Sequence, residues 1–372
     1  RAIYAREPVD LADPRWVFLN TFFSLSEACL YMQAVDLLDS GKLEDAMGYE
    51  DLHRVIRSCI DEAHMEGTLK AEILANPEHF VDLDPDLPLA MLDLKESGRT
   101  IMLITNSEWH YTKGLMDWAF DRFLPGSMTW RDLFDIKIVG ASKPSFFTHR
   151  NSAFEVVDDN GLLRTTRSID KGGIFLGGSA RLVEETLGIP GEDILYIGDH
   201  LFSDVHVSKS LLRWRTGLVV RELEPELMAL EGFKEKQRAL TDMMLQKDRW
   251  ENEYSQARLQ LQRLEKGYGP QPDLDAAALR TMMQSLRTRL VELDGRIAPL
   301  AMEAGQLVNG RWGLLMRAGN DKSHMARQIE RYADVYMSRV SNLLYASPFV
   351  YLRSMRGSLP HDHGPAGGTQ EP

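Results

Sequence analysis

Cysteine is nearly absent from this sequence of 372 residues, which contains only Cys29 and Cys59. Both lie among apolar positions of predicted helices, a setting typical of small buried hydrophobic residues in a reducing compartment. The pattern therefore indicates neither a disulfide framework nor a zinc site, and the expected location is the cytoplasm.

Long apolar runs and an excess of basic residues are also lacking. No run approaches the roughly 20 residues that span a bilayer, and no charged-then-apolar leader precedes the first predicted element. The formal net charge of −12 argues against non-specific binding to nucleic acid or anionic lipid, because the summed field repels polyanions. With 44% hydrophobic residues the chain can bury a large core, so a globular protein is expected, and any phosphate has to bind at a local site.

Residues 1–92 read as a helical region. Ser24 and Glu27 have the spacing of a capping box, and a first helix is predicted from there to Gly41. A second predicted helix begins near Leu52. Its polar residues Arg57, Asp61 and His64 lie within about 60° of one another around the helix axis, opposite the apolar face.

Residues 93–225 alternate short apolar runs with helical segments, which predicts an α/β fold with a doubly wound parallel sheet. Helices are predicted at 111–123, 180–187 and 201–212. The buried strands are expected at 99–104, 133–139, 173–176, 193–197 and 218–220.

The sheet pattern stops after Pro225. Apolar residues then follow a heptad rhythm on both sides of a Gly/Pro turn at 267–272, which predicts a helical hairpin over 226–304. A C-terminal helical segment is expected over 305–357, with a helix from about Lys322 to Leu344, and 358–372 are expected to be disordered.

Polar residues follow three of the predicted strands, where ligands bind in open parallel sheets. Thr105, Asn106 and Ser107 offer hydroxyl and amide groups to an anion, and Lys143 supplies a compact positive charge. Asp199 and Asp204 are carboxylates suited to a hard cation such as Mg²⁺. Each feature alone also has a purely structural explanation. Thr105 to Ser107 can form an ordinary helix cap, Lys143 can be a solvated loop residue and Gly-Asp199 a common turn. Their convergence on one sheet favours a functional site.

The order of these residues resembles the second, third and fourth motifs of the haloacid-dehalogenase (HAD) superfamily. The fuller pattern is similar to that of its cytosolic purine 5′-nucleotidase family and covers nearly the whole chain. The matching segments are Phe18-Leu-Asn-Thr-Phe-Phe23, Ile104-Thr-Asn-Ser107, Lys143-Pro-Ser-Phe-Phe147, Leu195-Tyr-Ile-Gly-Asp-His200, Trp214-Arg-Thr216, Arg331-Tyr-Ala-Asp334 and Asn342-Leu-Leu344.

The resemblance implies a phosphoaspartyl mechanism, in which an aspartate attacks phosphorus and water then hydrolyses the phosphoenzyme. It implies that Thr105, Asn106 and Ser107 hold the phosphate and that Lys143 pairs with it. It also implies that Asp199 ligates Mg²⁺ and that Asp204 steadies the ligand shell.

The resemblance also implies a nucleotide pocket at Arg57, Asp61, His64 and Lys70, which have the family spacing, with Phe23 stacking on the base. An Arg with an Asp presents donors and an acceptor to a 6-oxopurine edge, so a purine nucleoside monophosphate is the expected ligand. The structural alternative is an exposed i,i+4 ion pair with a neighbouring His. Members of the family tend to form tetramers, and a homo-oligomer is expected.

The family's first motif, Asp-x-Asp-x-Thr on the central strand of the sheet, is missing. Asp10 and Asp13 do not follow an apolar strand and are poor substitutes. We therefore expect this polypeptide to be inert and its full-length parent to be active. Two alternatives stay open. One is a non-catalytic scaffold that binds a partner, and the other is a sugar-phosphate phosphatase that has no use for the Arg57 group.

Overall fold

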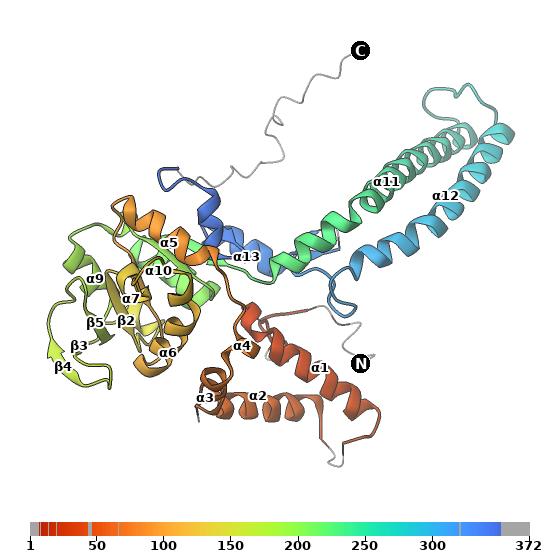
Figure 1. The fold of residues 1–372 in the computed structure, drawn as a ribbon. Coiled ribbons are helices and arrows are strands. Elements are labelled where there is room, and N and C mark those ends of the chain that lie inside the picture. Colours follow the sequence, from red (N-terminus) through yellow and green to blue (C-terminus); the bar gives the residue numbers. More distant parts are fainter. Residues whose placement is uncertain are drawn as a thin grey trace. The chain divides into compact units, whose positions relative to one another are not determined.

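The computed structural model describes residues 7, 9–13, 15–19, 21–43, 47–65, 67–319 and 321–350 (Figure 1). The chain divides into two compact units, one of Arg1–Arg221 with Ile329–Pro372 and the other of Glu222–Gln328. The tail 358–372, predicted to be disordered, lies outside the described residues. No helix in the described ranges has both the length and the apolar character needed to cross a membrane.

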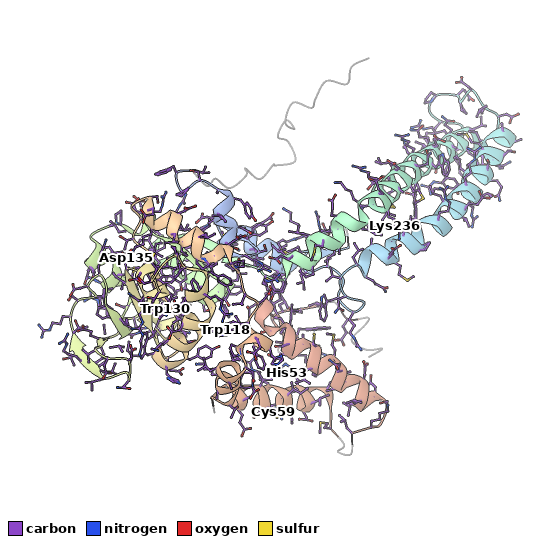
Figure 2. All side chains as sticks on the ribbon, viewed as in Figure 1. His53, Cys59, Trp118, Trp130, Asp135 and Lys236 are labelled. Carbon is purple, nitrogen blue, oxygen red and sulfur yellow. The ribbon has the colours of Figure 1, made fainter. Side chains whose placement is uncertain are left out.

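The first unit begins with helices that we call the cap. Leu52 and Ile56 of the second cap helix are buried, at 5% and 7% exposure. Cys59 lies on the outer side of this helix and is exposed, so the prediction of a buried residue was wrong there (Figure 2). The cap comprises η1 (Phe22–Ser24), α1 (Leu25–Asp39), α2 (Tyr49–Met65), α3 (Thr68–Ala75) and α4 (Pro77–Phe80).

The predicted capping box at the start of α1 does not form. Ser24 is the N-terminal cap residue, but its side chain makes no capping hydrogen bond. Glu27 turns instead toward α2, where Arg57 Nη1 lies 2.7 Å from Oε2 and His53 Nε2 lies 3.3 Å from Oε1. An ion pair with a neighbouring helix therefore takes the place of a local cap.

The α/β part of the first unit contains a five-stranded sheet in the order β1-β2-β5-β3-β4. β1, β2 and β5 are parallel, as predicted, and β3 runs antiparallel to both β5 and β4. The β3–β4 hairpin was not predicted from the sequence. The strands are β1 (Met102–Ile104), β2 (Ile136–Val139), β3 (Ala153–Val156), β4 (Leu163–Thr166) and β5 (Ile174–Gly177).

A second, three-stranded sheet has the order β10-β7-β6 and is entirely parallel. Its strands are β6 (Leu195–Gly198), β7 (Arg215–Val219) and β10 (Val335–Met337). The fold is therefore α/β with parallel strands, but the strands form two sheets where one was predicted. Among the described residues, β1 pairs only with β2 and β6 pairs only with β7, so each has one open edge.

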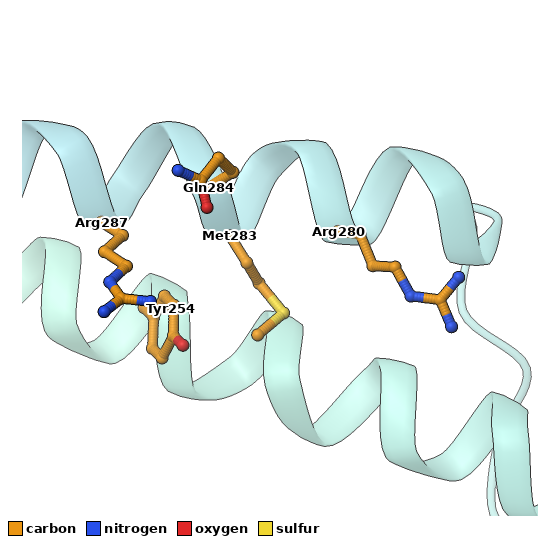
Figure 3. Close-up of a pocket in the computed structure, with 5 residues that line it drawn as sticks. All are labelled: Tyr254, Arg280, Met283, Gln284 and Arg287. Carbon is orange, nitrogen blue, oxygen red and sulfur yellow. The ribbon is translucent and has the colours of Figure 1, made fainter.

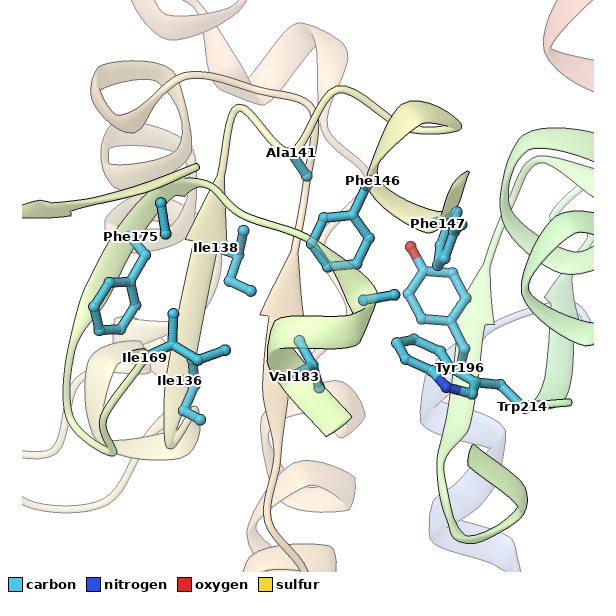
Figure 4. Packing of buried hydrophobic residues seen from close by; sticks show 12 residues of the cluster. Ile136, Ile138, Ala141, Phe146, Phe147, Ile169, Phe175, Val183, Tyr196 and Trp214 are labelled. Atoms are coloured by element: carbon cyan, nitrogen blue, oxygen red, sulfur yellow. The ribbon is translucent and has the colours of Figure 1, made fainter. Parts of the chain in front are cut away.

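One core cluster joins the two sheets (Figure 4). Ile136 and Ile138 of β2 are fully buried in it, Tyr196 of β6 and Trp214 belong to it, and Met102 and Ile104 of β1 pack against it. A second cluster contains Leu133 and Trp130, the latter labelled in Figure 2. The surrounding elements are α5 (Asp86–Glu96), α6 (Trp109–Ala119), η2 (Asp121–Phe123), α7 (Trp130–Leu133), α8 (Ser145–Thr148), α9 (Ala180–Leu187), η3 (Gly191–Asp193), η4 (Leu201–His206) and α10 (Val207–Leu212).

The predicted helix at 322–344 is correct only in part. α13 (His324–Tyr332) is followed by β10 and by the 3-10 helix η5 (Val340–Tyr345). The carboxylate of Asp334 accepts hydrogen bonds from the backbone N–H and the hydroxyl of Thr216, and these bonds dock the segment after α13 onto β7. Strand pairing with β7 therefore replaces further helical turns.

The second unit contains a hairpin of two helices, α11 (Leu223–Lys266) and α12 (Ala276–Gly305), with a short β8 (Arg317–Ala318) and β9 (Asp321–Lys322) pair. Asp275 caps α12, because its Oδ1 accepts a hydrogen bond from the Ala278 N–H at 2.7 Å. Leu240 of α11 packs with Leu293 and Ile297 of α12. A shallow pocket between the two helices is lined by Tyr254, Arg280, Met283, Gln284 and Arg287 (Figure 3).

Candidate active site

The loops that follow β1 and β2 are joined through Asn106. Its Oδ1 accepts a hydrogen bond from the Lys143 N–H at 2.6 Å, and its Nδ2 donates to the Lys143 carbonyl at 3.1 Å. Thr105 Oγ1 accepts from the Ser107 N–H at 3.1 Å, and the Ser107 carbonyl accepts from Gly140. The predicted Thr105–Ser107 segment and Lys143 are therefore adjacent in space.

Lys143 reaches from this loop to the second sheet. Its Nζ lies 2.9 Å from Asp204 Oδ1 and donates to the Tyr196 hydroxyl at 3.1 Å. The Lys143 side chain is 14% exposed and that of Asp204 is 2% exposed. A charge pair at this depth costs desolvation energy that only good hydrogen bonding offsets, so each partner is strongly fixed by the other.

Asp204 occupies its place because Gly198 leaves room for it. A Cβ atom added at Gly198 would lie 2.6 Å from the Asp204 Cβ, closer than real Cβ contacts allow. Asp204 Oδ2 also accepts from the His200 N–H at 3.2 Å. The turn after β6 and the π-helical η4 thus wrap the backbone around this carboxylate.

Tyr196 completes the cluster at the end of β6. Its hydroxyl donates to Asp204 Oδ1 at 3.3 Å. Burial, together with the carboxylate of Asp204, raises the pKa of Tyr196 well above its ordinary value, so the phenol keeps its proton. Tyr196 was not among the predicted site residues, although it lies in the Leu195–His200 segment.

Asp199, the predicted metal ligand, is exposed directly after β6. Its carboxylate is a hard oxygen donor that fits an oxygen-ligated cation, whereas both oxygens of the nearby Asp204 are already engaged by Lys143, Tyr196 and the His200 N–H. Within the described ranges, no group of three or more His, Cys, Asp and Glu side chains is arranged to hold a metal. The described residues therefore supply only some of the ligands that a metal ion would need.

The predicted base-binding residues lie on the cap. Arg57 Nε donates to Asp61 Oδ2 at 3.3 Å, while its Nη1 reaches the buried Glu27. The negative charge of Glu27 raises the pKa of Arg57 above its already high ordinary value. Arg57 and Asp61 keep about half of their side-chain surface exposed, at 53% each, so both stay accessible to a ligand.

Lys70 links the cap to the α/β part. Its Nζ donates to Glu108 Oε2 at 2.8 Å and lies 5.4 Å from the centre of the Tyr111 ring. Leu74 of α3 packs closely against α6, because a Cβ atom added at Gly114 of α6 would lie 3.0 Å from Leu74 Cδ2. The Lys70 hydrogen bond lowers the pKa of Glu108.

The predicted site residues thus form two groups. Thr105, Asn106, Ser107, Lys143 and Asp204 come together at the ends of β1, β2 and β6, and Lys70 contacts Glu108, the residue after Ser107. Arg57 and Asp61 pair on α2. The side chains of Phe23 and His64 lie outside the described part of the structure. None of the candidates lines the hairpin pocket.

Glu27, Glu108 and Tyr196 contact candidate residues but were not among the residues predicted from the sequence. Glu108 follows Ser107 directly in the sequence, and Tyr196 precedes Asp199 within one motif, so their positions offered a signal. Glu27 had already been assigned to a capping box. Its contact with Arg57 joins residues 30 apart, which local spacing does not reveal.

Comparison with known proteins gives consistent results. A sequence model described as the 5′ nucleotidase family matches residues 1–364. A 5′-nucleotidase domain-containing protein of Dictyostelium discoideum is 24% identical over 348 residues, which cover 92% of this chain and 54% of that protein. Human 5′-nucleotidase domain-containing protein 2 is 29% identical over 332 residues, which cover 87% of this chain and 56% of that protein. The chain spans about half the length of these relatives.

Proposed function

Because the chain belongs to the 5′ nucleotidase family, we propose that the full-length protein containing it is a Mg²⁺-dependent phosphatase of purine nucleoside monophosphates. Inosine and guanosine monophosphates are the expected substrates. The observation that carries this proposal is the pairing of the partly buried Lys143 with the buried Asp204 beside the Thr105–Ser107 segment, at the carboxyl ends of parallel strands.

The two loops give each side chain a task in phosphoryl transfer. The hydroxyls of Thr105 and Ser107 donate hydrogen bonds to phosphate oxygens, and the ammonium of Lys143 neutralises charge that develops during transfer. Both polar ends of Asn106 are occupied by the Lys143 backbone, which supports a role in holding the two loops together. Lys70 adds a second cation at the edge of the site.

The nucleophile in this proposal is an aspartate on a strand outside these residues. It attacks phosphorus as the bond to the ribose oxygen breaks, a second acid protonates that oxygen, and water then releases phosphate from the aspartate. Among the described residues, β1 and β6 each have one edge without a partner strand. Both strands border the same core cluster but are not hydrogen-bonded to each other, which supports a further strand between them. A strand placed between them would end beside Lys143.

Asp199 would hold Mg²⁺, with Asp204 supporting the turn that carries it. The cation would neutralise charge on the phosphoryl oxygens when bound. Asp204 is also the counter-ion of Lys143, so it fixes the position of the ammonium group. The exposed carboxylate of Asp199 is the one that stays available to a cation.

The base-binding part of the proposal rests on α2. Arg57 and Asp61 present donors and acceptors side by side, and Glu27 fixes the guanidinium from the opposite side. A 6-oxopurine edge offers the matching acceptor and donor. Cytoplasmic location and homo-oligomerisation remain predictions.

A non-catalytic scaffold is the second candidate function. The long hairpin of α11 and α12 favours it, because the hairpin includes none of the candidate site residues. A scaffold would not need a lysine buried against an aspartate at a strand end, and this pair favours the phosphatase.

The test is phosphate release from inosine and guanosine monophosphates with Mg²⁺, measured for this chain and for the full-length protein. We expect turnover by the full-length protein alone. Absence of turnover by a folded full-length protein would support the scaffold function.

A further inference from the structure

The ring of Tyr196 is fixed by its neighbours. It is 8% exposed, and it meets Phe147 edge-on at 5.2 Å and Trp214 at 5.9 Å between ring centroids (Figure 4). Phe147 belongs to α8, directly after the Lys143 loop, and Trp214 precedes β7. The position of the Tyr196 ring, and with it the hydroxyl, is therefore set by side chains from α8 and from the segment before β7.

Three atoms meet at this hydroxyl. Lys143 Nζ donates to it at 3.1 Å, it donates to Asp204 Oδ1 at 3.3 Å, and Nζ lies 2.9 Å from the same Oδ1. The Lys143 ammonium, on a flexible four-carbon stem, is thus held by two oxygens, one from Tyr196 of β6 and one from Asp204 of η4.

We propose that Tyr196 is a positioning residue that holds the ammonium of Lys143 at the site of phosphoryl transfer. The inference deepens the proposed function and rests on it. The hydroxyl is a neutral acceptor, so it orients the cation without cancelling its charge. A second carboxylate in its place would cancel the charge that the transferred group needs.

The test compares kcat and KM of full-length Tyr196→Phe with the unmodified protein, using inosine monophosphate. The substitution removes one oxygen and keeps the ring in the aromatic cluster. We expect kcat to fall about 10- to 100-fold, because a small misplacement of a catalytic group has effects of this order, and KM to stay within about 3-fold. Tyr336→Phe, which removes a hydroxyl from the exposed Tyr336 of β10, should leave both unchanged.

A double variant separates positioning from a general structural role. If Tyr196 acts through Lys143, Tyr196→Phe should cost nothing further in a Lys143→Ala background. An equal loss in both backgrounds, or an unchanged kcat in the single variant, overturns the inference while the proposed function stands.

If the full-length protein proves inactive, that result counts against the proposed function alone. The role of Tyr196 can then be tested by a measurement that does not depend on enzyme activity. Acetic anhydride labelling of Lys143 in the 372-residue chain is quantified by mass spectrometry, with the exposed Lys266 as internal reference. We expect Tyr196→Phe to speed labelling of Lys143 several-fold relative to Lys266. Equal labelling in both proteins would show that the hydroxyl does not hold the lysine.

Discussion

The ammonium group of Lys70 lies 2.8 Å from Oε2 of Glu108, the residue that directly follows Ser107. Helix α3 of the cap is therefore tied to the start of α6, next to the segment proposed to bind phosphate. An anionic ligand that displaces the Glu108 carboxylate would pair with the Lys70 ammonium.

Replacing Lys70 by Met in the full-length protein should raise KM for inosine monophosphate by about 10- to 100-fold, the cost of one charge-assisted hydrogen bond. kcat should change less, because the contact is made before and during transfer. Steady-state kinetics measure both. Lys42→Met, which alters an exposed lysine of the cap, is the control. An unchanged KM would remove Lys70 from the substrate site.

Replacing Asp61 by Ala should weaken hydrolysis of inosine monophosphate, because the base loses its acceptor and Arg57 loses one partner. Hydrolysis of ribose 5-phosphate, which has no base, should be unaffected. The ratio of kcat/KM for the two substrates is the measurement, with a fall of roughly 10-fold or more expected. Glu62→Ala, at the next position of α2, is the control. Equal rates for the Asp61 variant and the parent would favour a sugar-phosphate phosphatase.

Replacing Gly198 by Ala should displace Asp204, because the new Cβ would lie 2.6 Å from the Asp204 Cβ. Overpacking of this kind costs about 1–3 kcal/mol of stability and should also lower activity. Urea unfolding provides the measurement. Gly232→Ala in α11 meets no atom within 4 Å and is expected to stabilise its helix. Full retention of stability and turnover in Gly198→Ala would contradict the close approach.

Replacing Asp334 by Asn should destabilise the first unit by about 1–3 kcal/mol at neutral pH. Burial raises the pKa of Asp334, but hydrogen bonds from Lys209 and the Thr216 backbone outweigh it, and the net pKa is below the ordinary value of 3.8. The stabilising contribution is therefore complete above pH 3.8 and is lost as the pH falls through the lower folded pKa.

Unfolding free energies of Asp334→Asn and the parent should accordingly converge as the solution is acidified below pH 3.8. Asp93→Asn, at an exposed position of α5, should match the parent at every pH. A difference that persists unchanged into acid would mean that the charge of Asp334 is not the source of its stabilising effect.

Strong local patterns made much of the fold predictable. The predicted helix at 180–187 matches α9, and apolar runs located β1, β2, β5, β6 and β7 to within a few residues. β3 and β4 were missed because β4 is largely exposed and shows no buried alternation. β10 was missed because its pairing with β7 joins positions more than 100 residues apart.

Prediction of the candidate site was limited by distance in the sequence. Residues at strand ends were expected to converge, and Lys143 and Asp204 do meet. The spacing of residues does not predict that the Asn106 amide binds the Lys143 backbone or that the Tyr196 hydroxyl binds Lys143 Nζ. Each contact depends on how segments distant in the sequence pack together. The burial of Glu27 against Arg57 likewise depends on the packing of α1 against α2.

In the described part of the chain, β1 and β6 each have one unpaired edge, and under the proposed function these edges would receive the strand that carries the nucleophile. Unpaired backbone groups along two edges can each form a ladder, so an incoming strand would gain hydrogen bonds on both sides. If the proposed function holds, a synthetic peptide carrying that strand should complement the 372-residue chain and give phosphatase activity. The restored activity would then depend on peptide concentration and saturate as the gap fills.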